Sequence, residues 1–540
     1  MKKLLYVFSQ EDHWLFSMRC LVVLMVIFGA LLAYAAYLNP FIGHADQAAC
    51  AILAKNLCEG HGYYTTYLFQ FFKPYEIRHP DNVWPLLHPT VIALFFKIGG
   101  YTATMARLPN VIYILLMTLF TYIFAMKLIP DRRVAFVSAI VVLTGQRYNT
   151  GLLNNTGAVL FFLLFIMLVF MHESKSRWVW LIPAAFFAAL AALQRVEYIF
   201  FFPIYVFVKF LNYLLVSRSF LAAVKKTSMY VLFLLLVVVF MSPYFIRNIY
   251  SFGEILPDNA GFLALLAKYD NFSHEAQFGV YYGHNFTAPS ILFSKGAYHF
   301  VKTIFRSGAY VATYLSSGLG RIILTTFFLI GIFWGSKIFK RYKFFHLYVL
   351  STILFYAFFY SVIFSFEDRY LWYIYPYMAI FGVAVIFEGL EGAKKTSFGN
   401  YFLRVAPVII LMLHCIYYSS SVIWTNFRPL SPTHREIIAT SDWISKNSPP
   451  GTVFMSRQPW EASWHSGRDA VMVPYDTTRR ILEIMKAYKV DYLVLDIGDC
   501  PRPDLLNSIK TGALKGIEPV YKVGSTQIYK IDRNNLNFID

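Results

Sequence analysis

The sequence has few charged residues, and that scarcity excludes an ordinary soluble protein. Asp, Glu, Lys and Arg make up 14% of its 540 residues, whereas soluble domains carry about 25%. Hydrophobic residues make up 58% of the chain and aromatic residues 19%. Several apolar runs reach the length of about 20 residues that a helix needs to cross a bilayer. The sequence therefore predicts a multi-pass integral membrane protein.

Acidic residues are especially scarce, since 30 Asp and Glu oppose 48 Lys and Arg and leave a net charge of +18. A strongly basic chain can indicate a nucleic-acid partner. Here, however, much of the excess charge lies in short clusters between apolar runs, for example in residues 127–133 and 336–343. That arrangement is typical of the cytoplasmic loops of membrane proteins. We therefore expect membrane lipids, and no nucleic acid, as partners.

The chain is also poor in recognisable metal, repeat and targeting patterns. Its five cysteines have no spacing that is typical of a metal site. No convincing internal repeat is visible, which argues against a transporter because transporters are often built from repeated halves. The N-terminal apolar run lacks a cleavage-site pattern, so we interpret it as a retained anchor. No eukaryotic targeting signal is apparent, which favours a bacterial inner membrane.

The basic clusters predict the topology of the membrane spans. We place the N-terminus in the cytoplasm. If eleven helices cross the membrane and the short run 86–98 does not cross it, every basic cluster falls on the cytoplasmic side. The runs 134–145 and 178–193 are the shortest of the eleven. The expected spans cover residues 20–38, 105–129, 134–145, 154–171, 178–193, 198–216, 228–246, 309–334, 344–364, 370–388 and 405–424.

The predicted fold is mostly α, with a polytopic helical bundle over residues 1–425 and a small soluble α/β domain over residues 426–540 on the outer face. Two long external loops, 39–104 and 247–307, interrupt the bundle, and the first carries interfacial helices. Periodicity in the soluble domain predicts both strands and helices. We expect strands at 452–456 and 492–496, helices near 433–446 and 476–488, and a strand pair within 517–532.

Residues 46–59 of the first external loop predict a helix with an acid at its N-terminal end. Apolar side chains recur on the side of Asp46, whereas Lys55 and Glu59 lie opposite, so we expect the helix to lie on the membrane surface. Asp46 then has two interpretations. It is either an N-cap that accepts hydrogen bonds from the first turn or a catalytic carboxylate at the membrane surface.

Ionisable residues collect at the expected outer ends of the spans, where charge is costly and usually functional. The arginines of this group are Arg147, Arg195, Arg247 and Arg369. Arg195 with Glu197, or Arg369 with Asp368, can form a structural ion pair. Alternatively, several guanidiniums around one carboxylate form a site for an anionic ligand, because Arg binds phosphate oxygens through two parallel hydrogen bonds. An acid and arginines at the outer leaflet suit a substrate with a lipid phosphate.

Several segments, taken in order, resemble the GT-C superfamily of polyprenyl-phosphate-sugar glycosyltransferases, which includes protein O-mannosyltransferases and aminoarabinose transferases. GHADQAACAILAKNLCEGHGY resembles the first external loop of that superfamily, and PLLHPTVIALFFKIGG resembles its interfacial helix. ARLPN, LQRVEY, SPYFIRN and EDRYLWYIYPY resemble four further elements at the outer ends of its spans. KVDYLVLD lies in the matching soluble tail. The resemblance covers nearly the whole chain.

The resemblance implies an inverting sugar transfer on the non-cytoplasmic face, with the active site facing the periplasm of a bacterium. The donor would be a polyprenyl-phosphate-linked sugar, and the acceptor a hydroxyl or phosphate group of a lipid, a glycan or a protein. Asp46 would be the catalytic base. Gln47 stands where many members carry a second acid, which weakens the case for mannosyl transfer to protein. The other implied residues are Arg247, Arg369 and Arg195 for the donor phosphate and His88, Glu367 and Tyr370 for substrate binding.

Three alternatives remain open at this point. A divalent metal, as in aminoarabinose transferases, would take Glu76 and His79 as candidate ligands, although both also suit an ordinary loop. A transporter or flippase of lipid-linked sugars would likewise have many spans and external arginines. A polysaccharide polymerase would carry external arginines without needing Asp46.

Overall fold

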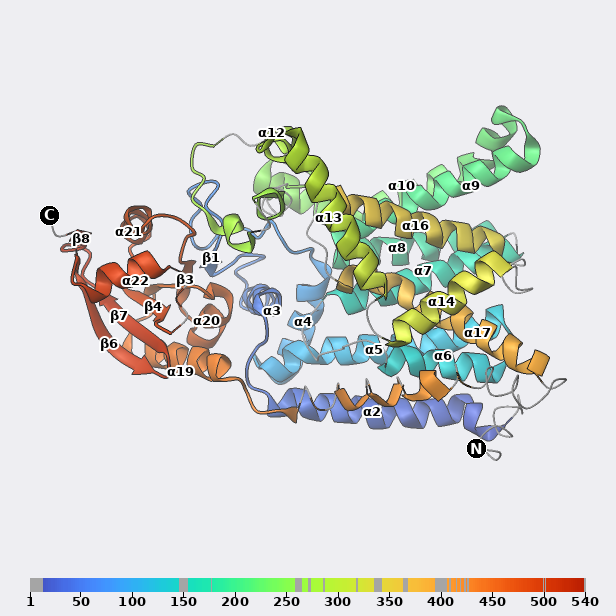
Figure 1. Cartoon of the computed structure of the whole chain (residues 1–540), viewed down its shortest axis with the longest axis horizontal. Helices are drawn as coiled ribbons and strands as arrows, with labels where there is room; N and C mark the ends of the chain where they lie inside the picture. Colours follow the sequence, from blue (N-terminus) through green and yellow to red (C-terminus); the bar gives the residue numbers. More distant parts are fainter. Residues whose placement is uncertain are drawn as a thin grey trace.

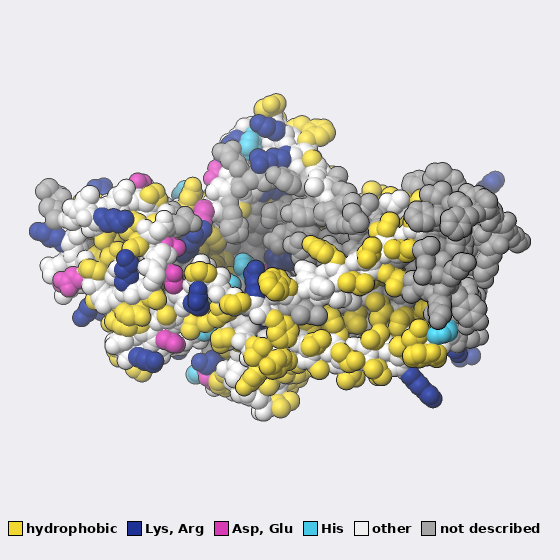
Figure 2. All heavy atoms as spheres, turned by 60° about the horizontal axis from the view of Figure 1, so that its bottom comes forward, with side chains coloured by type: hydrophobic (Ala, Val, Ile, Leu, Met, Phe, Trp, Pro, Cys, Tyr) yellow, Lys and Arg dark blue, Asp and Glu magenta, His cyan; other side chains and the backbone are white. Residues whose placement is uncertain are grey.

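The computed structural model describes residues 13–538 apart from several short stretches. A bundle of long helices lies at one end and a sheet domain at the other, with the first external loop between them (Figure 1). Apolar side chains gather over the bundle, whereas charged side chains gather over the sheet domain (Figure 2). Not described are residues 145–153, 176, 258–264, 271–272, 285–286, 317–318, 335–341, 363–367, 394–405, a few between 407 and 426, 499 and 501.

The bundle is built around α7, whose side chains are buried on nearly every side. A helix that is apolar all round belongs in the interior of a large helical protein. The short helices η3 (Val196–Phe200) and η5 (Asp368–Ile374) lead into α9 and α17. The bundle helices are α2 (Met18–Leu38), α5 (Ala103–Leu128), α6 (Arg132–Thr144), α7 (Asn155–Lys175), α8 (Leu181–Gln194), α9 (Phe201–Ser217), α10 (Phe220–Phe252), α13 (Gly296–Ser316), α14 (Leu319–Trp334), α16 (Lys343–Val362) and α17 (Tyr375–Ala393).

Seven helices among the described residues are long and apolar enough to cross a membrane. The predicted count of eleven is not reached, because α6 has 13 residues, α8 has 14 and α14 has 16. The expected span at 405–424 lies largely outside the described residues. Hydropathy cannot separate a helix that crosses the bilayer from one that is buried inside the protein. The seven helices are α2, α5, α7, α9 with η3, α10, α16 and α17 with the end of η5.

Arg107 holds the C-terminal end of α2 and the N-terminal end of α5 together. Its side chain is 3% exposed, and Nη1 donates to the backbone oxygens of Ala36 and Asn39 at 3.3 and 2.7 Å. Nη2 donates to the backbone oxygen of Phe41. The last carbonyls of a helix have no partner within it, so the guanidinium, together with the hydroxyl of Thr104 on Ala36, satisfies backbone oxygens at this helix end. Arg107 thereby fixes the path of the chain from α2 into α3 (Ala45–Cys58).

The C-terminal domain contains a six-stranded sheet of order β1-β3-β2-β4-β7-β6. Strands β2 (Val453–Ser456), β3 (Asp469–Met472) and β4 (Tyr492–Asp496) run parallel. The hairpin of β6 (Ile517–Val523) and β7 (Thr526–Ile531) joins β4 in antiparallel fashion. All the strands and helices expected in this region are present, while β3, α20, α22, β5 and β8 are additional. The remaining elements are α19 (Pro432–Asn447), α20 (Pro459–Ser466), α21 (Thr478–Ala487), α22 (Pro503–Lys510), β5 (Leu514–Lys515) and β8 (Asn537–Phe538).

The external loops contribute to this domain. Strand β1 (Tyr67–Leu68) of the first loop pairs in parallel with β3 and forms one edge of the sheet. In the second loop, the carboxylate of Glu275 accepts hydrogen bonds from Arg457 at 3.1 Å and from Arg502 at 3.0 Å. Contacts between residues so far apart in the sequence leave no local periodicity, which is why sequence analysis placed both loops with the membrane bundle alone.

The helix α3 is not the surface helix that the sequence predicted. It packs between α4 (Leu87–Gly99) on one side and α20 of the C-terminal domain on the other. Residues 47–54 are all buried and Lys55 is partly exposed, while Glu59, just beyond the end of the helix, is exposed. The small side chains along this stretch allow close approach from both sides. The C-terminal domain therefore covers the face that was expected to meet water.

Replacing Arg107 with Met should destabilise the protein markedly. The change removes the donor to the carbonyl oxygens of Asn39 and Phe41 and weakens the bonding of that of Ala36, which keeps only Thr104 at 3.4 Å; each buried unsatisfied group costs about 1–3 kcal/mol. We expect the Tm of the purified protein to fall by several degrees. Lys127→Met is the matched control, because Lys127 is an exposed cation at the other end of the same helix. Equal Tm values for the two variants would contradict the role given to Arg107.

Candidate active site

Asp46 faces Arg369 at the end of the bundle that lies toward the C-terminal domain (Figure 1). Asp46 lies in the first turn of α3, and Arg369 lies in η5, immediately before α17. Nη1 of Arg369 donates to Oδ2 of Asp46 at 2.8 Å. The two side chains are 17% and 20% exposed, so the pair is partly shielded from water. One of the three arginines implied by the sequence therefore contacts the carboxylate directly.

The N-cap of α3 is His44 and not Asp46. The amide oxygen of Gln47 accepts a hydrogen bond from the backbone N–H of His44 at 2.8 Å, which closes the first turn. Gly43 has a φ of +116°, and a Cβ at this position would coincide with the Gln47 side chain. Gln47 thus performs a capping function and leaves the carboxylate of Asp46 to face Arg369. The helix N-terminus also favours a negative charge there.

Arg195 is connected to Arg369 through Asn155, the first residue of α7. Nη1 of Arg195 donates to Oδ1 of Asn155 at 2.6 Å, and Nδ2 of Asn155 donates to the backbone oxygen of Arg369 at 3.1 Å. Arg195 also forms an ion pair with Glu197. Sequence analysis missed Asn155, although a polar residue at the outer end of a predicted span was a usable signal.

Arg247 holds the first external loop against the end of α10. Its Nη2 donates to the backbone oxygen of Asp81, and its Nη1 donates to Oδ1 of Asn248 at 2.9 Å. The guanidinium carbon lies 4.9 Å from the centre of the Tyr63 ring. The carboxylate of Asp81 accepts two backbone N–H groups of the following turn, at 2.7 and 3.1 Å. Burial raises the pKa of Asp81 to about 6, although these hydrogen bonds and Arg247 oppose the rise.

The remaining implied residues lie at several distinct places. His88 is buried in the first turn of α4, and its ring centre lies 6.4 Å from that of Tyr113. Glu367 lies outside the described residues, as does the side chain of Tyr370. The described structure thus brings together Asp46 and Arg369 directly and adds Arg195 through Asn155.

Glu76 and His79 do not fit the metal that the resemblance allows for. Glu76 is exposed, and Nδ1 of His79 lies 2.9 Å from the backbone oxygen of Glu76 and 3.2 Å from the hydroxyl of Thr65. Across the part of the chain that the structure describes, no three His, Cys, Asp or Glu side chains are grouped as a metal ion would need. The arrangement instead suits a histidine that stabilises its own loop.

Comparisons with known proteins identify the fold. A family model described as "Dolichyl-phosphate-mannose-protein mannosyltransferase" matches residues 83–246. ArnT from Cupriavidus metallidurans in the apo state is similar over 96% of this chain and 98% of its own, with 12% identity and a TM-score of 0.58. The apo oligosaccharyltransferase of Archaeoglobus fulgidus is similar over 97% of this chain and 76% of its own, with 12% identity and a TM-score of 0.59. A search of curated protein sequences gives no match.

ArnT bound to undecaprenyl phosphate is also similar, over 95% of this chain and 98% of its own, with 12% identity and a TM-score of 0.58. These similarities extend through both the bundle and the sheet domain. The chain has the GT-C fold. The resemblance to GT-C glycosyltransferases and the mostly helical fold class predicted from the sequence are thereby confirmed.

Within this GT-C fold, the C-terminal domain places a buried carboxyl group close to α3. Glu461 of α20 is 4% exposed, and its Oε2 atom has no hydrogen-bond partner among the described residues. His465, one helical turn further along the same face, accepts a hydrogen bond from the backbone N–H of Ile42 at 3.4 Å. This face of α20 therefore turns toward the start of α3. Burial raises the pKa of Glu461 to about 7, and repulsion from Asp46 contributes to the rise.

Glu461 should make the stability of the protein depend on pH. The carboxyl titrates at about 7 in the folded chain against a reference value of 4.5, so between these values the folded state holds a proton that the unfolded state has lost. Stability therefore falls as pH rises through this window, by up to about 3 kcal/mol. Glu461→Gln stays neutral and should remove this loss.

The comparison is best made as Tm between pH 6 and 7, the upper part of this window, because Asp81 contributes a similar trend at lower pH. Glu518 of β6 is exposed, so Glu518→Gln is the control, and its Tm should fall with rising pH as steeply as that of the wild type. The assignment of the slope to Glu461 is wrong if Glu461→Gln loses Tm with rising pH as steeply as the wild type.

Proposed function

We propose that this chain is an integral-membrane glycosyltransferase that moves a sugar from a polyprenyl-phosphate donor to a hydroxyl or phosphate group of a lipid, glycan or protein. The observation that carries the proposal is the contact of 2.8 Å between Asp46 and Arg369 at the outer end of the bundle. Similar structures contain undecaprenyl phosphate or dolichol phosphate, which supports this donor class. The proposed location is a bacterial inner membrane with the site facing the periplasm.

The proposed reaction inverts the configuration at the anomeric carbon. Asp46 accepts the proton of the acceptor group as general base. The acceptor oxygen then forms a bond to the anomeric carbon, while the bond from that carbon to the phosphate oxygen breaks. The electron pair of the broken bond leaves with the polyprenyl phosphate. Guanidiniums stabilise the charge that develops on that phosphate.

Arg369 has two partners in the proposed cycle. Without donor, its guanidinium neutralises Asp46 through the observed hydrogen bond. A donor phosphate competes for the same guanidinium, because Arg matches phosphate oxygens as well as carboxylates. Transfer of Arg369 to the phosphate leaves an oxygen of Asp46 available for the acceptor proton. Donor binding would thus activate the base.

The other assigned residues have supporting roles in the proposal. Arg195 is close enough to Arg369, through Asn155, to add a second positive charge beside the donor phosphate. Arg247 would have to release the backbone of the first loop in order to bind phosphate. His88, Glu367 and Tyr370 remain predicted substrate-binding residues.

Asp46→Asn should abolish transfer without unfolding the protein. Loss of a general base lowers a rate by about 100-fold to 10,000-fold, and Asn cannot accept the proton. We would measure the masses of lipid A, glycans and envelope proteins in cells that carry the wild type or the variant. One sugar-mass adduct should disappear. Glu59→Gln, at the other end of the same helix, is the matched control and should keep the adduct. An unchanged mass profile with Asp46→Asn would contradict the role of Asp46 as general base.

Binding of undecaprenyl phosphate should separate the roles of the two partners. Arg369→Gln removes a guanidinium that would contact the phosphate, so binding should weaken by about tenfold or more, as for the loss of a charged hydrogen bond. Asp46→Asn removes the competing carboxylate, so binding should stay equal or become tighter. The exposed Arg479 of α21 gives the control Arg479→Gln. Weaker binding in both site variants would contradict competition for Arg369.

A further inference from the structure

A second concave site lies on the other side of α3 from Asp46. It has a volume of about 410 Å³, which is within the range of about 300–1,000 Å³ for small-molecule sites. Lys55 reaches this pocket from α3, nine residues after Asp46, and nine residues correspond to two and a half helical turns. The two side chains therefore point to opposite sides of the helix. The pocket is separate from the candidate active site.

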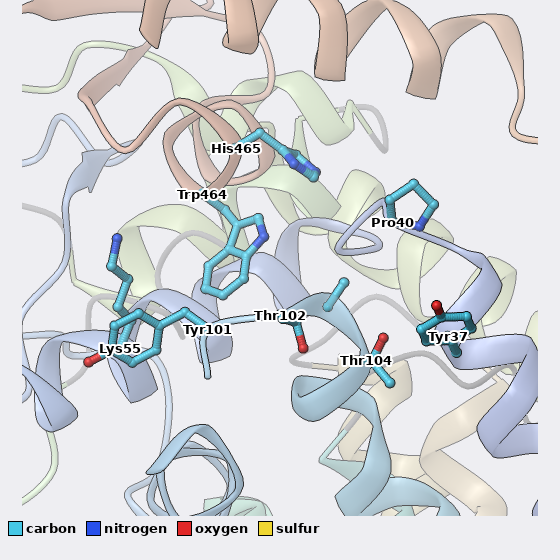
Figure 3. Close-up of a pocket in the computed structure, with 9 residues that line it drawn as sticks. Tyr37, Pro40, Lys55, Tyr101, Thr102, Thr104, Trp464 and His465 are labelled. Atoms are coloured by element: carbon cyan, nitrogen blue, oxygen red, sulfur yellow. The ribbon is translucent and has the colours of Figure 1, made fainter. Parts of the chain in front are cut away.

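The walls of the pocket come from four elements that meet at the outer end of the bundle. Lys55 and Tyr101 lie at one side, and Tyr37 lies at the opposite side (Figure 3). Trp464 and His465 of α20 cover the pocket from the C-terminal domain. The lining thus combines the end of α2, the start of α5, α3 and α20.

The polar groups of the pocket suit a phosphate. Nζ of Lys55 lies 5.7 Å from the centre of the Tyr101 ring and 4.0 Å from Glu59, so its charge is only loosely engaged. The hydroxyl oxygen of Thr102 accepts the backbone N–H of Met105 at 3.2 Å, which leaves the hydroxyl proton for a ligand.

His465 contributes no positive charge to the pocket at neutral pH. Burial and the charge of Arg107 lower its pKa to about 4. Among the residues that line the pocket, Lys55 is therefore the only cationic side chain. The pocket offers one positive charge, from Lys55, and hydroxyl groups elsewhere in its lining.

The position of the pocket favours a lipid over a soluble anion. Tyr37 is the penultimate residue of α2, and Thr102 is the N-cap of α5. Because both helices are long and apolar enough to cross the membrane, their outer ends lie at the level of the lipid head groups. Tyr and Trp concentrate at that level, as Tyr37, Tyr101 and Trp464 do here.

We propose that this pocket binds the phosphate-bearing head group of an anionic phospholipid from the outer leaflet. The lipid phosphate contacts Lys55, while the hydroxyl of Thr102 and the aromatic side chains contact the glycerol backbone. Because the walls belong to both the bundle and the C-terminal domain, the bound head group joins α20 to α2 and α5. Lipid binding therefore stabilises the docked position of the C-terminal domain, and this does not depend on the sugar transfer proposed above.

The test is the Tm of the full-length protein in a neutral detergent during titration with phosphatidylglycerol, phosphatidylcholine or inorganic phosphate. Phosphatidylglycerol should raise the Tm to a plateau, whereas the other two should not. In Lys55→Gln, the lipid concentration at half-maximal shift should rise by about tenfold, which corresponds to about 1.4 kcal/mol. Lys55→Arg keeps the charge and should restore most of the effect.

Lys97 of the neighbouring helix α4 is an exposed lysine outside the pocket, so Lys97→Gln is the matched control and should respond as the wild type does. This comparison separates the pocket from basic clusters elsewhere, which also attract anionic lipids. Equal shifts with the two lipids, or an unchanged response of Lys55→Gln, would overturn the proposal. A full shift with inorganic phosphate would instead assign the pocket to a soluble anion and would also overturn it.

Discussion

The short turn between α2 and α3 determines where the candidate base lies. After α2 ends at Leu38, six residues lead to the start of α3 at Ala45. The buried guanidinium of Arg107 binds the carbonyls at the end of α2 and in this turn. A carbonyl group has little freedom once it accepts a hydrogen bond inside a protein, so the turn is held rigidly. The position of Asp46 is thus set by a contact that takes no part in the proposed chemistry.

The C-terminal domain is part of the environment of α3 and not a separate attachment. Its sheet takes an edge strand, β1, from the first external loop, and its helix α20 covers α3. Glu461 and His465 on α20 face the same turn that Arg107 holds. A change in the docking of this domain would therefore alter the electrostatic environment of Asp46. This arrangement explains how a domain so distant in the sequence can influence the site.

Sequence analysis predicted local features well and long-range contacts poorly. Apolar periodicity located most bundle helices and the strands β2, β4, β6 and β7, because each depends on neighbouring residues. The pairing of β1 with β3 and the burial of α3 depend on residues about 400 positions apart. Asn155 was missed although its place at the end of a predicted span was a usable signal, whereas Glu461 was not singled out because an isolated polar residue has no pattern until its neighbours are known. The count of eleven spans is not confirmed, because three of the expected spans form helices of 13 to 16 residues and a fourth lies largely outside the described residues.

The three implied arginines differ in what they would have to give up to bind a phosphate. Arg247 is bound to backbone carbonyls and stacked on Tyr63, so its release would free the first external loop. The guanidinium of Arg195 forms an ion pair with Glu197 and donates a hydrogen bond to Asn155. Arg369 is paired with Asp46 through a partly exposed contact, and in the proposal a phosphate replaces the carboxylate there. Among the three arginines, Arg369 is the one that touches the candidate base, which would link donor binding to the proposed chemistry at a single guanidinium.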